Sequence, residues 1–285
     1  MVALKSFQPR TVNKLKKKIK TALRSVLARP IFSKLRTLTI PDDYIWFSGG
    51  WLSPVKFNED GMATAHNADF LKSKQFIKAY EAGCATESWG PIGRTHLRWR
   101  VFNACTLSKY AMRVPGDFVE CGTNRGGNAA AIMSYNEFEN SDKKFFLLDT
   151  FSGFDFTMLT AKEENSVDVE AYKKRFQDCY EDVKKYFSSQ PSVKVIKGSV
   201  PSTLSQIDSE KIAFLHLDMN CSAPERAAIE YLWDRITPGG VVLLDDYAWD
   251  EHEEQKQSLD EFAASKGIEV VGMATGQGLI IKPYW

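Results

Sequence analysis

The chain has 285 residues, 44% hydrophobic and 26% charged, which is typical of a soluble globular protein with one main α/β core and a smaller additional region. No apolar run approaches the ~20 residues that span a bilayer, and the N-terminus lacks a secretory signal pattern. The five cysteines are odd in number and form no Cys-x-x-Cys pair, so we expect reduced thiols in a cytoplasmic protein.

The first 36 residues form a basic arm. They contain eleven Lys and Arg and no Asp or Glu, leaving 26 basic and 36 acidic residues, a net charge of −10, on the rest of the chain. Apolar residues at helical spacing predict an amphipathic helix that ends before Pro30. Such a helix can contact an anionic membrane surface peripherally or an acidic partner, or it can pack on its own domain or a second subunit. The narrow apolar face without Trp favours packing, and nothing beside the charge indicates nucleic-acid binding.

Residues 37–96 form a second region, irregular and rich in Gly, Pro and aromatic residues, with a helix expected over 68–82. An aromatic region before a cofactor domain can cover a bound substrate as a lid, or it can be a structural cover for the sheet. Both interpretations stay open. Trp46 and Trp51 are candidates for the walls of a ring-binding site.

From residue 97 to residue 285 the pattern becomes regular, and short apolar strands alternate with helices. We expect strands at 117–121, 145–149, 193–197, 212–218, 240–245, 268–273 and 279–283, and helices at 97–112, after Gly127, and at 167–187, 224–236 and 253–266. This alternation predicts a doubly wound, Rossmann-like α/β fold with a mostly parallel sheet. A short Gly turn makes the last strand antiparallel, which is characteristic of class I methyltransferases.

The end of the first of these strands predicts a nucleoside-cofactor site. Glu120 is followed by Gly122 and by a Gly126-Gly127 pair that opens a helix, and glycines let the backbone approach a ligand closely. The spacing is not that of nicotinamide dehydrogenases, because Asn124 stands where their second glycine would be. S-adenosylmethionine has no pyrophosphate and needs no such cradle. Backbone N–H groups can bind its carboxylate, and Glu120 can interact with its ammonium group.

The next two strands complete this prediction. Asp149 ends the second strand, where doubly wound folds bind a ribose diol, and Gly198-Ser199 follow the third, beside the expected adenine edge. The residues predicted to bind S-adenosylmethionine are Glu120, Gly122, Thr123, Asn124, Arg125, Gly126, Asp149, Thr150, Phe151, Gly198, Ser199 and Asp218.

The fourth and fifth strands end in acids. Asp218 ends the fourth strand, and Asp245-Asp246 end the fifth. Carboxylates gathered at one edge of a sheet repel one another, and a cation among them lowers that cost. Oxygen ligands favour Mg²⁺, or another divalent cation, over Zn²⁺. We therefore predict a metal site at Asp218, Asp245 and Asp246, whereas His216, on a strand expected to be buried on both faces, is expected to be a core residue.

With these motifs the chain resembles the macrocin O-methyltransferase family, whose members methylate sugar hydroxyls on macrolide and aminocoumarin antibiotics. The resemblance covers most of 95–283 and rests on Pro115-Gly-Asp-Phe-Val-Glu-Cys-Gly122, Arg125-Gly-Gly127, Asp149-Thr-Phe-Ser-Gly-Phe154, Leu217-Asp218 and Pro238-Gly-Gly-Val-Val-Leu-Leu-Asp-Asp-Tyr247. It implies a class I fold, S-adenosylmethionine, Mg²⁺ on the same three aspartates, and a mobile N-terminal region that helps to cover the substrate and contributes to dimer contacts. The family's second acid and its tyrosine after strand four are replaced by Asn220 and Ser222, so we expect a different acceptor pocket.

We therefore expect a homo-oligomeric, S-adenosylmethionine-dependent O-methyltransferase for a hydroxyl of a sugar or similar vicinal diol, in a natural product or glycan. Mg²⁺ would bind two adjacent hydroxyls and lower the pKa of one. Asp218 is the first candidate for the base, with His252 and Glu251 next. A catechol-like phenol suits the same chemistry. A nicotinamide-dependent oxidoreductase is disfavoured by the missing glycine, and a non-catalytic, membrane-tethered member by the retained acids.

Overall fold

The computed structural model describes residues 44–47, 51–89, 96–166, 170, 174, 176–250 and 252–285. The chain divides into two compact units, one formed by residues 1–58 and 63–68 and the other by residues 59–62 and 69–285. The predicted basic arm and Glu251 lie outside the described residues. Within the described part of the chain, no helix combines the length and the apolar character needed to cross a membrane.

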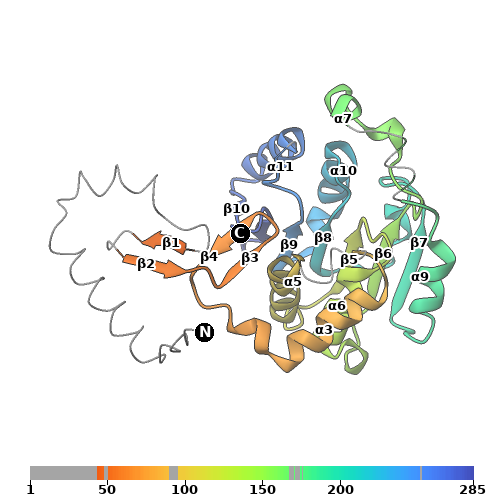
Figure 1. The fold of residues 1–285 in the computed structure, drawn as a ribbon. Coiled ribbons are helices and arrows are strands. Elements are labelled where there is room, and N and C mark those ends of the chain that lie inside the picture. Colours follow the sequence, from red (N-terminus) through yellow and green to blue (C-terminus); the bar gives the residue numbers. More distant parts are fainter. Residues whose placement is uncertain are drawn as a thin grey trace, which may run out of the picture. The chain divides into compact units, whose positions relative to one another are not determined.

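The larger unit contains a seven-stranded sheet. Its strands are β5 (Asp117–Cys121), β6 (Phe145–Asp149), β7 (Val193–Lys197), β8 (Ile212–Leu217), β9 (Ile236–Leu244), β10 (Val271–Gly272) and β11 (Gly278–Ile281). They lie in the order β10-β11-β9-β8-β5-β6-β7 (Figure 1). β5 to β9 are parallel, and β11 is antiparallel to both of its neighbours. The mostly parallel sheet and its antiparallel C-terminal hairpin are therefore confirmed.

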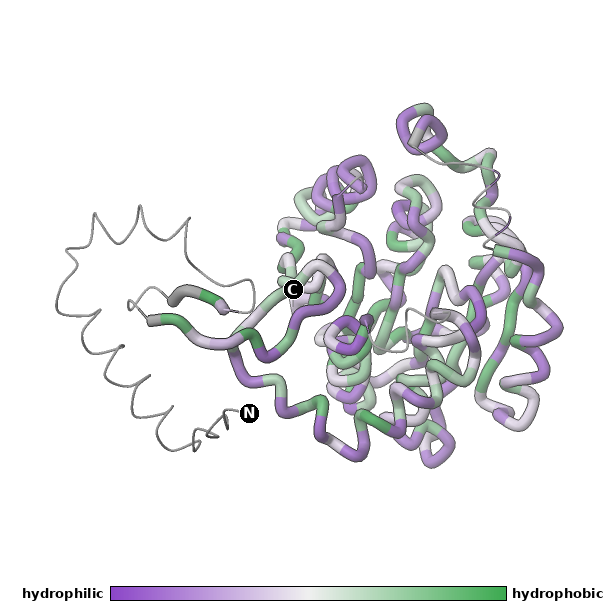
Figure 2. Tube along the Cα trace, viewed as in Figure 1, coloured by the Kyte–Doolittle hydropathy of each residue, from purple (hydrophilic) through white to green (hydrophobic). Residues whose placement is uncertain are grey.

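Helices cover both faces of this sheet. Among the described residues of the unit, the α-helices are α3 (Lys74–Ala85), α5 (Arg98–Ala111), α6 (Gly127–Asn136), α7 (Ala161–Ser166), α9 (Tyr180–Tyr186), α10 (Ser222–Leu232) and α11 (Glu253–Ser265). Side chains of α5, α6 and α9 join the core on one face, which contains Phe118 of β5. Those of α10 and α11 join the core on the other face, which contains Val119. Successive strand residues thus point into opposite cores, as a doubly wound sheet requires; in Figure 2 the central strands are mostly green and α11 mostly purple.

The helix predicted over 68–82 begins later than expected. A single 3₁₀ turn covers Asp69–Lys72, and α3 starts after Ser73, whose hydroxyl accepts a hydrogen bond from the Phe76 N–H at 3.4 Å. A serine that accepts such a bond marks the start of a helix, because it satisfies one of the unpaired N–H groups of the first turn. α3 then packs against α6 and α5 through an aromatic cluster.

The prediction of one long helix over 167–187 is wrong. The backbone is irregular at 176–179, and α9 begins only at Tyr180. At this break the Cys179 N–H donates to the Phe151 carbonyl at 2.9 Å, a contact with the loop after β6. The charged, helix-favouring sequence is overridden here by tertiary contacts.

Strand β9 starts at Ile236, four residues before the predicted start at 240. Ile236 pairs with Ile212 of β8, and the register then shifts before Phe214, which accommodates the Pro-Gly-Gly stretch within the strand. The helix before it, α10, accordingly ends at Leu232 rather than 236. At the sheet edge, β10 is only two residues long instead of the predicted six.

Residues 44–64 contain short strands, so the prediction of an irregular segment is wrong there. β1 (Tyr44–Phe47) and β2 (Trp51–Pro54) pair antiparallel, and β3 (Phe57–Glu59) and β4 (Met62–Thr64) form a second ribbon. The turn of the second ribbon, Asp60-Gly61, has φ of +52° and +73°, as in the type I′ turns that favour Asp-Gly. This turn belongs to the larger unit.

Candidate active site

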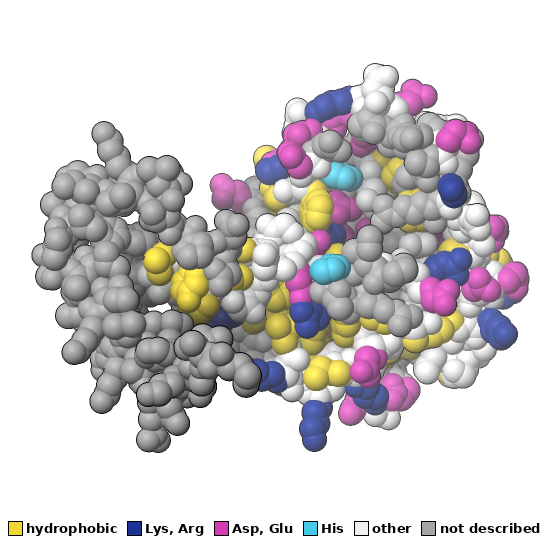
Figure 3. Space-filling model, viewed as in Figure 1, with side chains coloured by type: hydrophobic (Ala, Val, Ile, Leu, Met, Phe, Trp, Pro, Cys, Tyr) yellow, Lys and Arg dark blue, Asp and Glu magenta, His cyan; other side chains and the backbone are white. Residues whose placement is uncertain are grey.

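The carboxyl edge of the parallel strands opens into a cavity of about 920 Å³. The loops that follow β5, β6, β7, β8 and β9 line it, together with the start of α5 and the Asp60 turn. Figure 3 shows acidic and basic side chains between two histidines on one face of the molecule. Because ligands of open α/β sheets bind at this edge, the cavity is the candidate active site. We call the wall formed by the loops after β5, β6 and β7 the donor half, and the wall formed by the loops after β8 and β9 with Arg100 and Asp60 the acceptor half.

Asp149 connects two loops of the donor half. Its Oδ2 accepts the Asn124 N–H at 2.7 Å, and its Oδ1 accepts the Phe151 N–H at 2.5 Å. Burial raises the pKa of this carboxyl, although the backbone hydrogen bonds oppose the shift. Oδ1 also accepts from the Thr150 hydroxyl at 3.3 Å. A carboxylate has about four lone-pair positions, so Asp149 can still accept a hydrogen bond from a diol in the cavity.

Three loops of the cavity contain a residue in the left-handed backbone region. Asn124, Phe151 and Asn220 have φ of +49°, +56° and +57°, each in the loop after a strand and each lining the cavity. The left-handed region suits Asn, but it is unfavourable for a bulky residue such as Phe151. Strain of this kind persists only where the surrounding structure fixes it, which the hydrogen bonds to Asp149 do for two of the three loops.

The glycines after β5 make room for protein rather than for a ligand. A Cβ on Gly122, whose φ is +93°, would lie 1.9 Å from the Asp218 carbonyl oxygen. A Cβ on Gly126 would lie 2.6 Å from the Phe187 ring. Gly122 therefore allows the donor half to contact the start of the acceptor half directly, which is a different role from the close ligand approach expected from the sequence.

Glu120 lies behind the wall of the cavity rather than in it. It is 1% exposed, and its Oε1 is 2.9 Å from Nδ1 of His216. His216 is fully buried, as expected of a core residue, and its Nε2 is 3.6 Å from Oδ1 of Asp245. Burial alone would lower the pKa of His216, but the two carboxylates raise it well above its usual value. The interaction of Glu120 with the ammonium group of the cofactor stays a prediction.

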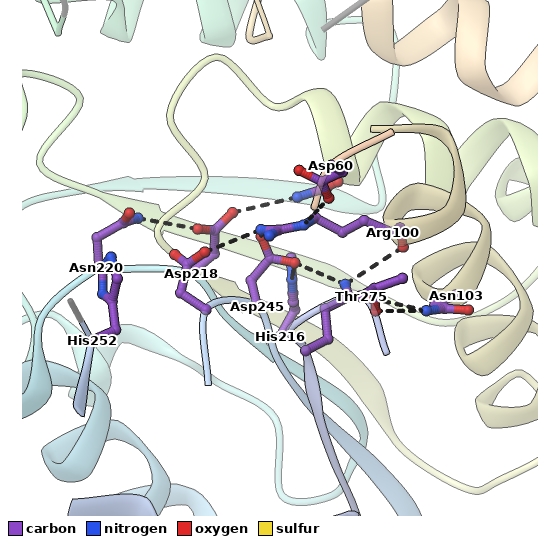
Figure 4. A network of polar contacts seen from close by, with 12 residues as sticks. Asp60, Arg100, Asn103, His216, Asp218, Asn220, Asp245, His252 and Thr275 are labelled. Atoms are coloured by element: carbon purple, nitrogen blue, oxygen red, sulfur yellow. Dashed lines mark hydrogen bonds and ion pairs between the residues drawn. The ribbon is translucent and has the colours of Figure 1, made fainter. Parts of the chain in front are cut away.

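The acceptor half is organised around Arg100, which the sequence did not single out (Figure 4). Its Nη1 donates to Asp245 at 2.5 Å and to Asp246 at 3.1 Å, and its Nε donates to Asp60 at 3.1 Å. The guanidinium also lies 4.8 Å from the ring centroid of Trp249. One cation is therefore surrounded by carboxylates from the β3–β4 turn and from the end of β9.

These contacts shift the pKa values of the three predicted metal-ligating aspartates in different directions. Burial would raise the pKa of Asp245, but Arg100 and His216 hold it well below the usual range. Burial and repulsion from Asp245 and Asp246 raise the pKa of Asp218 well above the usual range. Burial and Asp245 also raise the pKa of Asp246, against the opposing effect of Arg100. Asp245 is thus stably ionised, whereas Asp218 and Asp246 lack full charge compensation.

Two carboxylates of the acceptor half fit a hard divalent cation. Asp218 and Asp245 each offer a ligand oxygen, and these atoms lie within 4.8 Å of one another and of a ring nitrogen of His216. His216 itself is buried between Glu120 and Asp245, which raise its pKa, so the oxygen ligands are those of the aspartates. Asp218 accepts only long hydrogen bonds, 3.4 Å from Asn128 and 3.2 Å from Asn220. Burial and like-charge repulsion together raise the pKa of Asp218, and a cation would relieve the repulsion.

Asn220 is the position where the chain departs from the motif it resembles. Its amide donates to Oδ1 of Asp218, whereas an aspartate here would add another negative charge beside that carboxylate.

His252 also lines the cavity, and its Nδ1 is 2.8 Å from Oε1 of Gln255. Because that oxygen can only accept, Nδ1 carries a proton, and in the neutral imidazole Nε2 is the nitrogen with the lone pair.

Most of the predicted cofactor and metal residues come together in this one cavity. All of them line it except Glu120 and Gly126. The side chains of Trp46 and Trp51 lie outside the described part, and the aromatic residues found in the cavity wall are Trp89, Phe151, Phe154, Phe176 and Trp249. Arg100 could have been noticed from the sequence, because it stands four, eight and eleven residues before Ala104, Ser108 and Ala111 on the buried face of α5.

The doubly wound sheet, its C-terminal antiparallel hairpin and the position of the cavity define a class I methyltransferase fold. Solved structures agree. The O-methyltransferase NovP is 20% identical, with a TM-score of 0.58 over 67% of this chain and 81% of NovP. The calicheamicin methyltransferase CalS11 is 14% identical, with a TM-score of 0.54 over 76% of this chain and 98% of that protein.

The family described as Macrocin-O-methyltransferase (TylF) matches residues 54–273, and the chain belongs to this family. Mycinamicin III 3''-O-methyltransferase of Micromonospora griseorubida is 23% identical over 198 residues, 64% of this chain and 75% of that enzyme. A tetracenomycin-C 4'-O-methyltransferase of Streptomyces olivaceus is 26% identical over 162 residues, 51% of this chain and 58% of that enzyme. The chain is therefore an S-adenosylmethionine-dependent O-methyltransferase, which excludes the oxidoreductase and non-catalytic alternatives.

Proposed function

We propose that the enzyme transfers the methyl group of S-adenosylmethionine to a hydroxyl of a sugar or similar vicinal diol, assisted by Mg²⁺ or another divalent cation. The observation that carries this proposal is the acidic acceptor half. Asp218, Asp245 and Asp246 line the same cavity as the donor loops, and the pKa values of Asp218 and Asp246 are raised by burial and mutual repulsion. The relative from Streptomyces olivaceus is named for a 4'-O-methyl transfer on a rhamnosyl compound.

The transfer forms a carbon–oxygen bond to the acceptor and breaks the carbon–sulfur bond of the donor, which releases S-adenosylhomocysteine. The hydroxyl proton must leave in the same reaction. Asp218 is the first candidate to receive it, because it lies in the cavity where the donor half meets the acceptor half. His252 is the second candidate, because Nδ1 is held by Gln255 and the neutral imidazole would offer the lone pair of Nε2.

A protonated Asp218 cannot accept a proton, so its raised pKa has to fall before it can act as a base. A divalent cation held by Asp218, Asp245 and Asp246 would lower that pKa and would also lower the pKa of a coordinated acceptor hydroxyl. The residues of the chain supply the alignment of the reactants. The donor half fixes the direction of the methyl group, and correct alignment alone contributes several kcal/mol to such reactions.

The experiment that tests the proposal is removal of divalent cations with EDTA, followed by dialysis and an assay with methyl-labelled donor. We expect methyl transfer to fall at least ~100-fold and to return when Mg²⁺ is added back, because the acceptor hydroxyl loses its activation. Binding of S-adenosylhomocysteine, measured by calorimetry, should change little in the same samples. Full turnover in the dialysed enzyme would eliminate the role of the cation.

The acceptor class is tested in the same assay with a panel of sugars, glycosides and small diols. We expect labelled product from acceptors with two adjacent hydroxyls, and none when either hydroxyl is replaced by hydrogen. A catechol offers the same pair of oxygens, and the aromatic side chains of Trp89 and Trp249 in the cavity wall suit its flat ring. Transfer to catechols but to no sugar would replace the sugar proposal with the phenol alternative.

A further inference from the structure

Arg100 is a buried cation inside the proposed metal site. Its side chain is 9% exposed, and it contacts carboxylates of Asp60, Asp245 and Asp246. Residues more than 140 positions apart in the sequence are joined by these ion pairs (Figure 4). The rest of the acceptor half holds the guanidinium in place, because Trp249 covers it at 4.8 Å and Asp60 binds its Nε.

The charges in this group do not balance without a further cation. Asp60, Asp218, Asp245 and Asp246 are four carboxylates, and Arg100 donates hydrogen bonds to three of them. Asp218 makes no hydrogen bond to Arg100 among the described contacts, and it accepts only from the amides of Asn128 and Asn220. A divalent cation therefore still finds a favourable potential beside Asp218.

Any cation that coordinates Asp245 or Asp246 must nevertheless lie close to the guanidinium. Oδ2 of Asp245 is already 2.5 Å from Nη1 of Arg100, and Oδ1 of Asp245 accepts from Gln277 at 2.9 Å. Two positive groups that share one carboxylate repel each other strongly where the side chains are as buried as those of Arg100 and Asp245. Arg100 and a divalent cation thus compete for the same oxygens.

We propose that Arg100 is a resident counter-cation, which competes with the divalent cation for Asp245 and Asp246 and keeps the affinity of the free enzyme for that cation low. This inference rests on the proposed function, because it needs a divalent cation at this site. Arg100 is accordingly a positioning residue that acts through the aspartates. Asp60 contributes by binding Arg100 on the side away from the metal-ligating carboxylates.

The test is direct titration of the full-length protein with Mn²⁺, followed by the electron paramagnetic resonance signal of the unbound ion. Arg100→Met removes the positive charge but keeps a long side chain, and we expect Mn²⁺ to bind at least ~10-fold more tightly, about 1.4 kcal/mol. Arg100→Lys keeps the charge, and its affinity should stay within ~3-fold of the wild type. Asp60→Asn removes a negative charge and leaves Arg100 to the other carboxylates, so Mn²⁺ should bind more weakly.

The matched control is Arg98→Met. Arg98 is also on α5, two residues before Arg100, but it pairs with Glu59 at the end of β3 rather than with the metal-ligating aspartates. Its Mn²⁺ affinity should equal that of the wild type. General damage to the fold weakens ion binding in every variant, so tighter binding in Arg100→Met alone supports the proposal. If the wild type binds Mn²⁺ and Arg100→Met binds it equally well or more weakly, the inference is overturned and the proposed function stays intact. If neither the wild type nor any variant binds Mn²⁺, the metal site itself is overturned.

Discussion

The donor half of the cavity is built mainly from backbone, whereas the acceptor half is built from charged side chains. In the donor half, Asp149 holds two loops by their N–H groups, and strained residues such as Phe151 fix the path of the chain. In the acceptor half, Arg100 and the aspartates hold one another by ion pairs across distant elements. A side-chain substitution in the acceptor half should therefore alter metal-ion binding and the rate of methyl transfer without disturbing the donor half.

The largest expected effect is the fall in the turnover number of methyl transfer in the variant Asp218→Asn. This variant keeps the shape of the side chain but removes a proton acceptor and a metal ligand, so we expect the turnover number to fall roughly 10³-fold. Because Asp218 follows β8 and so belongs to the acceptor half, the comparison predicts that the rate falls far more than the affinity for the cofactor. Steady-state kinetics at saturating S-adenosylmethionine measure the effect.

The control for that variant is Asp208→Asn. Asp208 pairs with Lys144 and Lys194 on the surface, with an exposed side chain, and it does not line the cavity. Its turnover number should match that of the wild type. Normal turnover in Asp218→Asn would move the proton acceptor to another residue, and His252→Gln would then be the next variant to assay.

A smaller effect, on the stability of the fold rather than on the rate, is expected from a carboxyl group that lies beneath the acceptor half and does not line the cavity. Glu225, in the first turn of α10, is fully buried and accepts the Met219 N–H at 3.0 Å. Burial raises the pKa of its carboxyl from 4.5 to about 8. The folded protein therefore keeps a proton that the unfolded chain has released, and the stabilisation, complete below about pH 4.5, is lost as the pH rises to 8.

Glu225→Gln keeps the accepting oxygen and removes this titration. Its free energy of unfolding should equal that of the wild type near pH 4.5 and exceed it by on the order of 4 kcal/mol at pH 9. Urea unfolding across this pH range measures the difference. The exposed control Glu261→Gln should show no such trend, and a difference for Glu225→Gln that stays constant with pH would show that the carboxyl is already ionised.

The sequence predicted the parts of the molecule that local patterns determine. The strands β5, β6 and β7 have the predicted boundaries, because each is a short run rich in apolar residues. The apolar side chains of β5 and β6 are buried, whereas in β7, at the edge of the sheet, Val193 and Val195 are only partly buried. The ends of β6 and β8 place Asp149 and Asp218 at one edge of the sheet, since parallel strands share their carboxyl edge. Most of the donor half followed from this rule alone.

What the sequence did not reveal depends on contacts between distant residues. The ion pairs of Arg100 join α5 to the end of β9, and no local pattern contains that information. The break before α9 likewise depends on a hydrogen bond between Cys179 and Phe151. The hairpin turn at Asp60-Gly61 is a different case, because an Asp-Gly pair in a sequence favours a type I′ hairpin turn and could have predicted it.

The central claim, that one cavity joins a backbone-built donor half to a separable acidic acceptor half, is tested most directly by calorimetric titration of S-adenosylhomocysteine into two variants. In Asp149→Ala the loops of Asn124 and Phe151 lose their common anchor, and we expect at least ~10-fold weaker binding, since hydrogen bonds to charged groups contribute about 1.5–3 kcal/mol. In Asp218→Asn the dissociation constant should stay within ~3-fold of the wild type. Equal loss of binding in both variants, or normal binding in Asp149→Ala, would contradict the account.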